Sequence, residues 1–330
     1  MFYDVSSNSS RGAFVFSLDT ELAWGGVHSR NVESRQSHFA GTRGAVRRLL
    51  GLLETFEIRA TWAVVGHLML DECSRTGSVP HPEIVRPEYD WRQGDWFDLD
   101  PCSTSRESPH WYAPDMIESI LACKVAQEIG CHTFSHVIVG DPGCSKECFT
   151  SELQACLDVA DDWGLELRSF VFPRNSIAHL DVLRRFGFTA FRGEVETSWG
   201  TSLPGTLGRA ARAALWSTPA HPLTAPVSLR AGMWDIPATS FFIHRDGLAS
   251  KIPMGMRVWR ATRGVEQAAK DGSIFHLYLH PFNLASDPDA LLGGLESVFR
   301  HVATLRDRGK LWNPTMGRLA AELGQIEVRV

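Results

Sequence analysis

The sequence predicts an α/β fold built around a parallel sheet that closes into a barrel. Strand-like and helix-like segments alternate along all 330 residues, with no repeat, low-complexity tract or flexible linker between them. Polar, reactive side chains follow several of the expected strands, and barrels place their chemistry at this carboxyl end. No G-x-G-x-x-G turn follows the first strand, which disfavours a doubly wound, dinucleotide-binding sheet.

The expected strands are short runs rich in β-branched and aromatic residues. Residues 13–18 and 58–65 form the first two, and a third ends just before His132. Later strands are expected at residues 167–172, 188–192, 233–236 and 273–279.

Amphipathic helices are expected between most of these strands. One apolar stripe repeats at helical spacing through Val46, Leu49, Leu50, Leu53 and Phe56. A second helix begins at Pro114, because proline suits the first turn of a helix. Further helices are expected near residues 149–160 and 177–186, whereas residues 71–112 are predicted to be irregular.

Composition and charge exclude several classes of protein. The net charge is −5 and no basic stripe is visible, so we expect no nucleic-acid partner. No apolar run approaches the roughly 20 residues of a membrane helix. Seven cysteines without a CxxC pair, behind a start that lacks a secretory signal, predict reduced thiols in a cytoplasmic protein. A homo-oligomer is compatible with this composition.

Two histidines, His132 and His136, follow a short apolar run and are four residues apart. Neutral imidazole is the commonest metal ligand among side chains, and this spacing lets two rings converge on one ion. The spacing alone does not decide, because His276 and His280 share it. His276 falls in the middle of a strand, where a buried core histidine is expected.

Other strand ends carry further polar groups. Asp19 and Glu21 follow the first strand, and in extended backbone residues two apart point to the same side. Arg174 and Asn175 follow a later strand, and His280 follows the last. Each group alone is typical of a turn or a helix cap. Their shared position at strand ends favours one common site.

The chain resembles the polysaccharide deacetylase (NodB-homology, carbohydrate esterase) family. The match lies in residues 16–21 (FSLDTE), 60–66 (ATWAVVG), 128–136 (EIGCHTFSH) and 277–281 (LYLHP), and runs in register over roughly residues 12–320. The resemblance implies a distorted, TIM-like (β/α)7 barrel. It also implies a single catalytic domain over residues 1–330, with insertions at about 71–112 and 194–232.

The same resemblance implies a role for each strand-end group. Glu21, His132 and His136 would hold a divalent metal ion, zinc first, with cobalt, nickel, manganese or iron as alternatives. Asp19 would be the catalytic base and His280 the acid. The family's usual first motif has adjacent aspartates, whereas this chain has DTE, so the carboxylate ligand is either Glu21 or Asp19.

The family's Arg-Pro-Pro motif appears here as residues 171–174 (VFPR), with the arginine displaced. Either Arg174 or Arg192 therefore orients the base. Substrate contacts are expected from Arg174, Asn175, Trp24, Trp111 and Trp234, although such tryptophans also serve as core residues.

The predicted function is removal of an N-acetyl or N-formyl group from an aminosugar or a glycan precursor. The nearest alternative is an allantoinase-like amidohydrolase that opens cyclic amides or ureides. Two histidines and one carboxylate also describe non-haem iron oxygenases, which need neither an aspartate base nor a late acid. A metal-free, carbohydrate-binding relic of the fold is a further alternative.

Overall fold

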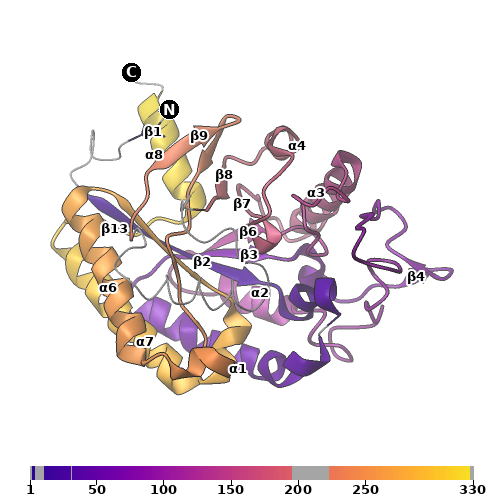
Figure 1. Cartoon of the computed structure of the whole chain (residues 1–330), viewed down its shortest axis with the longest axis horizontal. Coiled ribbons are helices and arrows are strands. Elements are labelled where there is room, and N and C mark those ends of the chain that lie inside the picture. Colours follow the sequence, from indigo (N-terminus) through magenta and orange to yellow (C-terminus); the bar gives the residue numbers. More distant parts are fainter. Residues whose placement is uncertain (1, 4–10, 31, 195–222, 328–330) are drawn as a thin grey trace.

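The computed structural model describes residues 2–3, 11–30, 32–194 and 223–327, and its helices wrap around a curled sheet (Figure 1). The sheet order is β1-β9-β10-β8-β7-β6-β3-β2-β12-β11, and β13 also pairs with β2. The strands are β1 (Phe2–Tyr3), β2 (Gly12–Thr20), β3 (Thr61–Val64), β6 (Glu128–Cys131), β7 (Ser169–Val171), β8 (Ala190–Arg192), β9 (Val227–Arg230), β10 (Met233–Asp235), β11 (Ser240–Phe241), β12 (Ile274–Leu279) and β13 (Leu311–Trp312).

The strands from β10 through β8, β7, β6, β3, β2 and β12 to β11 all run parallel. One short segment closes the barrel, because β10 pairs with β8 and β11, five residues later, pairs with β12. If β10 and β11 are counted as one bent strand, the described residues form seven parallel strands. The predicted α/β, TIM-like barrel is confirmed.

Alternation along each strand separates two cores. In β2, Phe14, Phe16 and Leu18 pack outward against the helices. Ala13 and Val15 belong to a second cluster that fills the barrel interior. Asp19 and Glu21 follow the same alternation and point inward, above the apolar interior. The sequence analysis predicted that these two side chains share one side.

The helices cover the outside of the sheet, and α1, α6 and α7 run along its lower side in Figure 1. The predicted stripe of α1 is confirmed, because Val46, Leu49 and Leu53 are all buried. The helices are α1 (Gln36–Thr55), α2 (Pro114–Leu121), α3 (Lys146–Asp162), α4 (Leu180–Arg185), α6 (Met254–Asp271), α7 (Pro288–Asp307) and α8 (Met316–Glu327). None of the helices in the described part of the chain is both long and apolar enough to cross a membrane.

One helix begins later than predicted. The expected helix at residues 177–186 starts only at Leu180. Arg174, Asn175 and His179 all have left-handed backbone, with φ of 56°, 53° and 52°. This conformation interrupts a right-handed helix, so Asn175 does not cap α4 but lies in the loop above the barrel.

The first expected insertion, residues 71–112, carries only the small hairpin of β4 (Arg75–Thr76) and β5 (Val79–Pro80), which projects at the right of Figure 1. Its irregular chain is nevertheless anchored, because Trp96, Phe97 and Tyr112 are almost fully buried. Residues 195–222, which make up most of the second expected insertion (about 194–232), lie outside the described residues.

Candidate metal and catalytic centre

The first strand delivers two buried carboxylates to the barrel mouth. Asp19 is 4% and Glu21 5% exposed. Gly25, one turn further on, lets the backbone approach Glu21, because a Cβ at that position would lie 2.2 Å from Glu21 Oε1. The backbone of Gly25 therefore packs closely against the side chain of Glu21.

The two histidines of the third segment meet Glu21. Glu21 Oε2 lies 2.8 Å from His136 Nε2 and 3.5 Å from His132 Nε2. His132 Nδ1 donates to the carbonyl of Val171 at 2.7 Å, which leaves Nε2 as the atom with a free lone pair. That buried Nε2 has no hydrogen-bond partner among the residues that the structure describes.

Glu152 of α3 supports the loop that carries both histidines, a role that no sequence pattern indicates. Its side chain is fully buried and accepts hydrogen bonds from the backbone N–H groups of Phe134 and Ser135, both at 2.8 Å, and from the Ser135 hydroxyl at 2.5 Å. Burial raises its pKa to about 7, although these three donors favour the charged form. Thr133 and His136 have left-handed backbone in this loop, with φ of 59° and 64°.

Replacing Glu152 by alanine is expected to lower the free energy of unfolding by about 3 kcal/mol, because it leaves buried backbone donors unsatisfied. The metal affinity should fall as well, since the histidine loop loses its anchor. Urea unfolding and metal titration measure the two effects. Gln154→Ala, at an exposed position of the same helix, is the matched control. Unchanged metal affinity in Glu152→Ala would exclude this supporting role.

Arg192, not Arg174, contacts Asp19. Its Nη1 and Nη2 donate to Asp19 Oδ1 at 2.5 Å and Oδ2 at 2.7 Å, and the guanidinium is buried. The guanidinium also stacks 4.3 Å from the ring centroid of Tyr278, an inward residue of β12 that sequence reasoning missed. Arg174 is exposed at the rim. Of the two arginines expected to orient the base, Arg192 is therefore the one that contacts Asp19.

Asn175 lies in the same layer as Arg192. Its Oδ1 accepts from Arg192 Nη2 at 3.1 Å, and its Nδ2 donates to Glu194 Oε1 at 2.8 Å. Both ends of the amide are therefore engaged with the protein. This geometry indicates that Asn175 positions Arg192 and does not bind substrate through its amide.

His280 completes the group from the end of β12. Its Nε2 lies 3.7 Å from both Asp19 Oδ2 and Glu21 Oε1. Its side chain is 25% exposed, against 5% for Asp19 and 7% for Glu21. The rings of Phe241 and Phe282 flank it, each with its centroid 5.6 Å away. His280 is thus the member of the group most open to solvent.

The charge states suit a cation. Burial opposes ionisation of Asp19, yet Arg192 lowers its pKa. Burial also opposes ionisation of Glu21, but His280 and His136 hold its pKa well below the usual value. Burial lowers the pKa of His136, against the attraction of Glu21. Two ionised carboxylates beside a neutral imidazole are the state in which these side chains bind a metal ion.

His276 is a core histidine, as the sequence indicated. Its ring is fully buried, Nδ1 donates to the carbonyl of Ile236 at 3.2 Å, and Nε2 lies 2.9 Å from Ser17 Oγ. Burial lowers its pKa to about 3, which keeps the ring neutral. Ser17 in turn accepts from Arg192 Nη1 at 3.2 Å, so His276 supports the charged layer from below.

The structure does not bring all the predicted substrate residues to the site. Trp24 is fully buried, and its indole N–H donates to the carbonyl of Trp111 at 3.2 Å. Trp234 is 4% exposed and belongs to the apolar cluster of the barrel interior. These two rings serve as core and offer no exposed face. Trp111, which is half-buried, packs edge-on against Trp24 with the ring centroids 5.1 Å apart.

Two further histidines near the mouth were not predicted. The ring of His28 lies 6.4 Å from that of His136, and burial and the Arg174 charge lower its pKa to about 4. The pKa of His244 is lowered by burial, against the attraction of Asp246. His28 lies in the short 3-10 helix after β2 (Leu22–Ser29) and His244 in a loop, and no strand or helix period in the sequence marks either residue, so only the folded chain shows that they border the site.

Comparison with solved structures decides the fold family. Over 99% of this chain and 96% of the other, the protein is similar to a "putative polysaccharide deacetylase" from Mycobacterium smegmatis, with a TM-score of 0.61 and 15% identity. The fold is that of the polysaccharide deacetylases. A "probable polysaccharide deacetylase" from Pseudomonas aeruginosa PAO1 has a TM-score of 0.53, 13% identity and coverage of 94% and 89%.

A third similar structure is the Puue allantoinase, with a TM-score of 0.53, 13% identity and coverage of 97% of this chain and 92% of that one. No protein-family model and no curated protein matches the sequence. The shared deacetylase fold therefore rests on structure and on the motifs quoted above.

Proposed function

We propose that the protein is a metal-dependent amide hydrolase that removes an acetyl or formyl group from the nitrogen of an aminosugar or a sugar-containing precursor. The observation that carries this proposal is the convergence of Glu21, His132 and His136 beside a second carboxylate, Asp19. The candidate ligand atoms of Glu21, His132 and His136 all lie within 4.8 Å of one another.

The residues present fit a catalytic metal ion. His132 Nε2 is a buried atom with a free lone pair and no hydrogen-bond partner in the described part of the chain, and it faces Glu21. Three protein ligands, two of them imidazoles, leave a coordination position open, which is typical of catalytic zinc. When bound, the ion supplies an activated water and polarises the acyl carbonyl.

Asp19 acts in this proposal as the general base. Both its oxygens are held by Arg192, which fixes the direction of the remaining lone pairs and keeps the carboxylate ionised. The carboxylate accepts the proton of the attacking water. Arg192 is a positioning residue, and its positive charge remains paired while the proton is held at Asp19.

His280 acts as the general acid. An amine is a poor leaving group unless it is protonated, and His280 Nε2 lies on the same side as both carboxylates. Its partial exposure lets it exchange protons with solvent between turnovers. The products are a free amine and acetate or formate.

Replacing His280 by alanine is expected to lower kcat/KM on an unactivated amide by about 10²–10⁴-fold. The metal content should not change, because His280 is not among the proposed ligands. On an activated ester, whose leaving group needs no proton, the loss should be much smaller. Equal losses on amide and ester would remove His280 from the role of acid.

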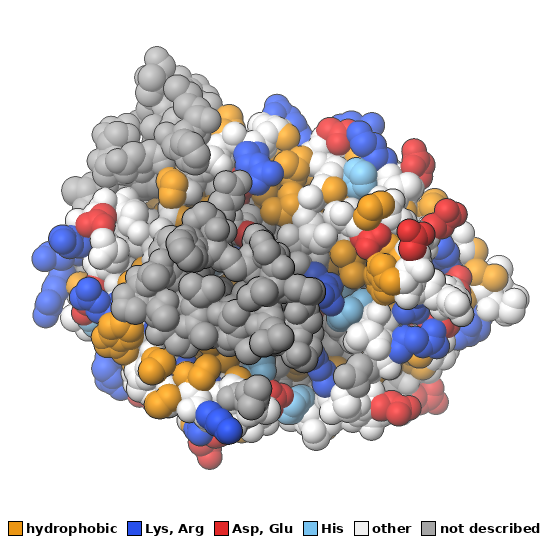
Figure 2. Space-filling view, viewed as in Figure 1, with side chains coloured by type: hydrophobic (Ala, Val, Ile, Leu, Met, Phe, Trp, Pro, Cys, Tyr) orange, Lys and Arg blue, Asp and Glu red, His pale blue; other side chains and the backbone are white. Residues whose placement is uncertain are grey.

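A polar rim supports a sugar as the substrate. The exposed residues Arg174 and Glu194 border the mouth, and polar groups of this kind orient the hydroxyls of a bound sugar. Charged side chains of both signs are interspersed over the face seen in Figure 2, with no continuous basic band among the coloured residues. That surface favours a small or glycan-precursor substrate over nucleic acid.

Hydrolysis of a cyclic amide or ureide is the second candidate, favoured by the similarity to an allantoinase over nearly the whole chain. The same base, acid and ligands would open a ring instead of releasing a separate acid. Metal-loaded protein incubated with N-acetyl and N-formyl aminosugars, nucleotide sugars and cyclic ureides separates the two. Release of acetate or formate supports the first candidate, and ring opening alone supports the second. Metal binding without turnover of any compound, or no metal binding, favours a relic of the fold.

A further inference from the structure

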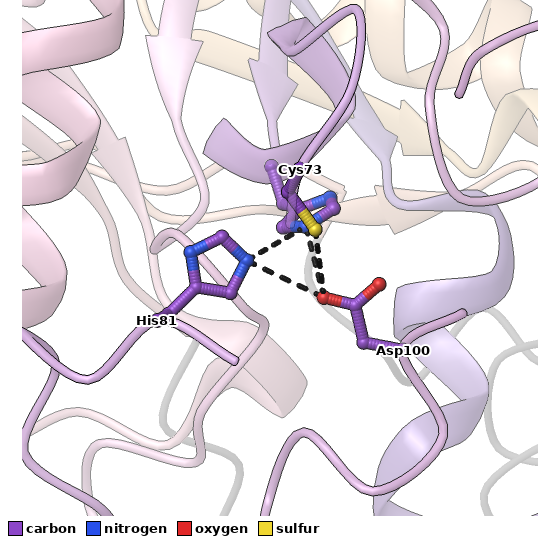
Figure 3. A group of neighbouring side chains, drawn as sticks. Cys73, His81 and Asp100 are labelled. Atoms are coloured by element: carbon purple, nitrogen blue, oxygen red, sulfur yellow. Dashed lines mark hydrogen bonds and ion pairs between the residues drawn. The ribbon is translucent and has the colours of Figure 1, made fainter. Parts of the chain in front are cut away.

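A second group of metal-binding side chains lies outside the candidate catalytic centre. His67 follows β3, and Cys73, His81 and Asp100 belong to the irregular segment that comes after it. Figure 3 shows Cys73, His81 and Asp100 pointing toward a common centre. His67 and Asp100 have fully buried side chains, and that of His81 is 9% exposed.

Four of the six edges between the four candidate ligand atoms have the lengths of tetrahedral edges, and all four atoms lie within 4.8 Å of one another. His67 Nε2 lies 3.1 Å from His81 Nε2 and 3.2 Å from Asp100 Oδ2. Asp100 Oδ2 lies 3.3 Å from His81 Nε2 and 3.5 Å from Cys73 Sγ. Around zinc, with Zn–N and Zn–O near 2.0 Å and Zn–S near 2.3 Å, tetrahedral edges are about 3.3 Å between N and O ligands and about 3.5 Å between S and O.

Neighbouring groups already orient the ligands. His67 Nδ1 lies 3.3 Å from the carbonyl of Trp111, and His81 Nδ1 lies 3.4 Å from Glu83 Oε1. Each contact ties down one ring nitrogen and leaves Nε2 for the centre. Asp100 Oδ1 accepts from the Cys102 backbone N–H at 2.9 Å and the Tyr112 hydroxyl at 3.2 Å, so that Oδ2 faces the other ligands.

The geometry points to a second metal site, a structural zinc site of two histidines, one cysteine and one aspartate. Four protein ligands leave no coordination position open, which distinguishes it from the three-ligand centre at the barrel mouth. The ligands span residues 67–100, so the ion would fasten the irregular segment to the end of β3. Cys73 and His81 also line a cavity of about 950 Å³, which gives an ion access to the site.

Cobalt substitution tests this site independently of activity. Among the two candidate clusters in the described residues, only this one contains a thiol, Cys73, so a sulfur-to-cobalt absorption band can arise only here. Protein stripped of metal with a chelator is titrated with Co²⁺ and followed by absorption. We expect a sulfur-to-cobalt charge-transfer band in the near ultraviolet, together with d–d bands of tetrahedral intensity. Metal analysis of the purified protein should give two ions per chain.

Four variants test whether the charge-transfer band comes from Cys73. Cys73→Ser should lose it, whereas Cys102→Ser, which removes a neighbouring thiol outside the cluster, should keep it. His136→Ala should keep it as well, although the catalytic centre is disabled. His81→Ala is a second ligand variant, which should shift or abolish the band if Cys73→Ser does not fold, with circular dichroism as the check on folding.

Folded, cobalt-saturated wild-type protein without a charge-transfer band would overturn the inference, and so would a band that survives in Cys73→Ser. In that case the cluster is a metal-free hydrogen-bond network among His67, His81 and Asp100. Because the band does not depend on turnover, absence of hydrolase activity would refute the proposed function and leave this result unaffected.

Discussion

Protein with His132 or His136 replaced by alanine is expected to lose one metal ion per chain and to have no activity above background. Each histidine supplies a ring nitrogen that faces Glu21 Oε2, at 3.5 Å and 2.8 Å. Removing either leaves two protein ligands, too few to retain a divalent ion through dialysis. Inductively coupled plasma mass spectrometry of the dialysed protein measures the loss.

His276→Gln is the matched control, because His276 has the same four-residue spacing to a second histidine but lies in the core. Its two nitrogens already contact Ile236 and Ser17, so the metal content should equal that of the wild type. Loss of metal from this variant, with retention in the other two, would overturn the ligand assignment. If the structural zinc site exists, one ion should remain in His132→Ala and in His136→Ala, and two in His276→Gln.

Replacing Asp19 by asparagine is expected to lower kcat/KM by about 10²–10⁴-fold with no loss of metal. The amide has nearly the shape of the carboxylate and can still accept from Arg192, but it cannot take a proton from water. Steady-state kinetics on the best substrate of the panel, with metal analysis on the same sample, gives both quantities. Full activity would favour a reaction without a base, such as that of an iron oxygenase.

Glu21→Gln separates the two carboxylates. The sequence left open which of them binds the metal, because one threonine stands between them. The structure engages both oxygens of Asp19 with Arg192 and turns Glu21 Oε2 toward the histidines. Glu21→Gln should therefore weaken metal binding, whereas Asp19→Asn should not. The reverse pattern would exchange the two roles.

Much of the barrel, together with the direction of Asp19, Glu21 and His280, could be predicted because these residues follow the period of two along strands. The roles of His132 and His136 came instead from the family resemblance, because their loop has no such period. Phe14 and Phe16 turn outward, so residues 13, 15, 17, 19 and 21 turn inward. The same alternation in β12 places His276, Tyr278 and His280 on one side. Regular backbone thus fixes the side-chain direction before the tertiary structure is known.

The remaining features depend on contacts between segments far apart in the chain. Arg192 could be chosen over Arg174 only in the folded barrel. There Arg192 of β8 reaches Asp19 of β2, which is not a neighbouring strand, and the left-handed turn at Arg174 leaves that side chain exposed. The ligands at 67, 73, 81 and 100 have irregular spacing in a segment without a period. Trp24 became a core residue because the irregular segment folds over it.

In the proposed enzyme, the loop after the first strand and the loop after β6 hold one cation between them. Anomalous diffraction at the zinc edge, from crystals of the zinc-loaded protein, tests it most directly. We predict a peak within coordination distance of Glu21 Oε2, His132 Nε2 and His136 Nε2. A zinc-saturated crystal with no peak at that position, or with Glu21 turned away from both rings, would contradict a metal centre between these two loops.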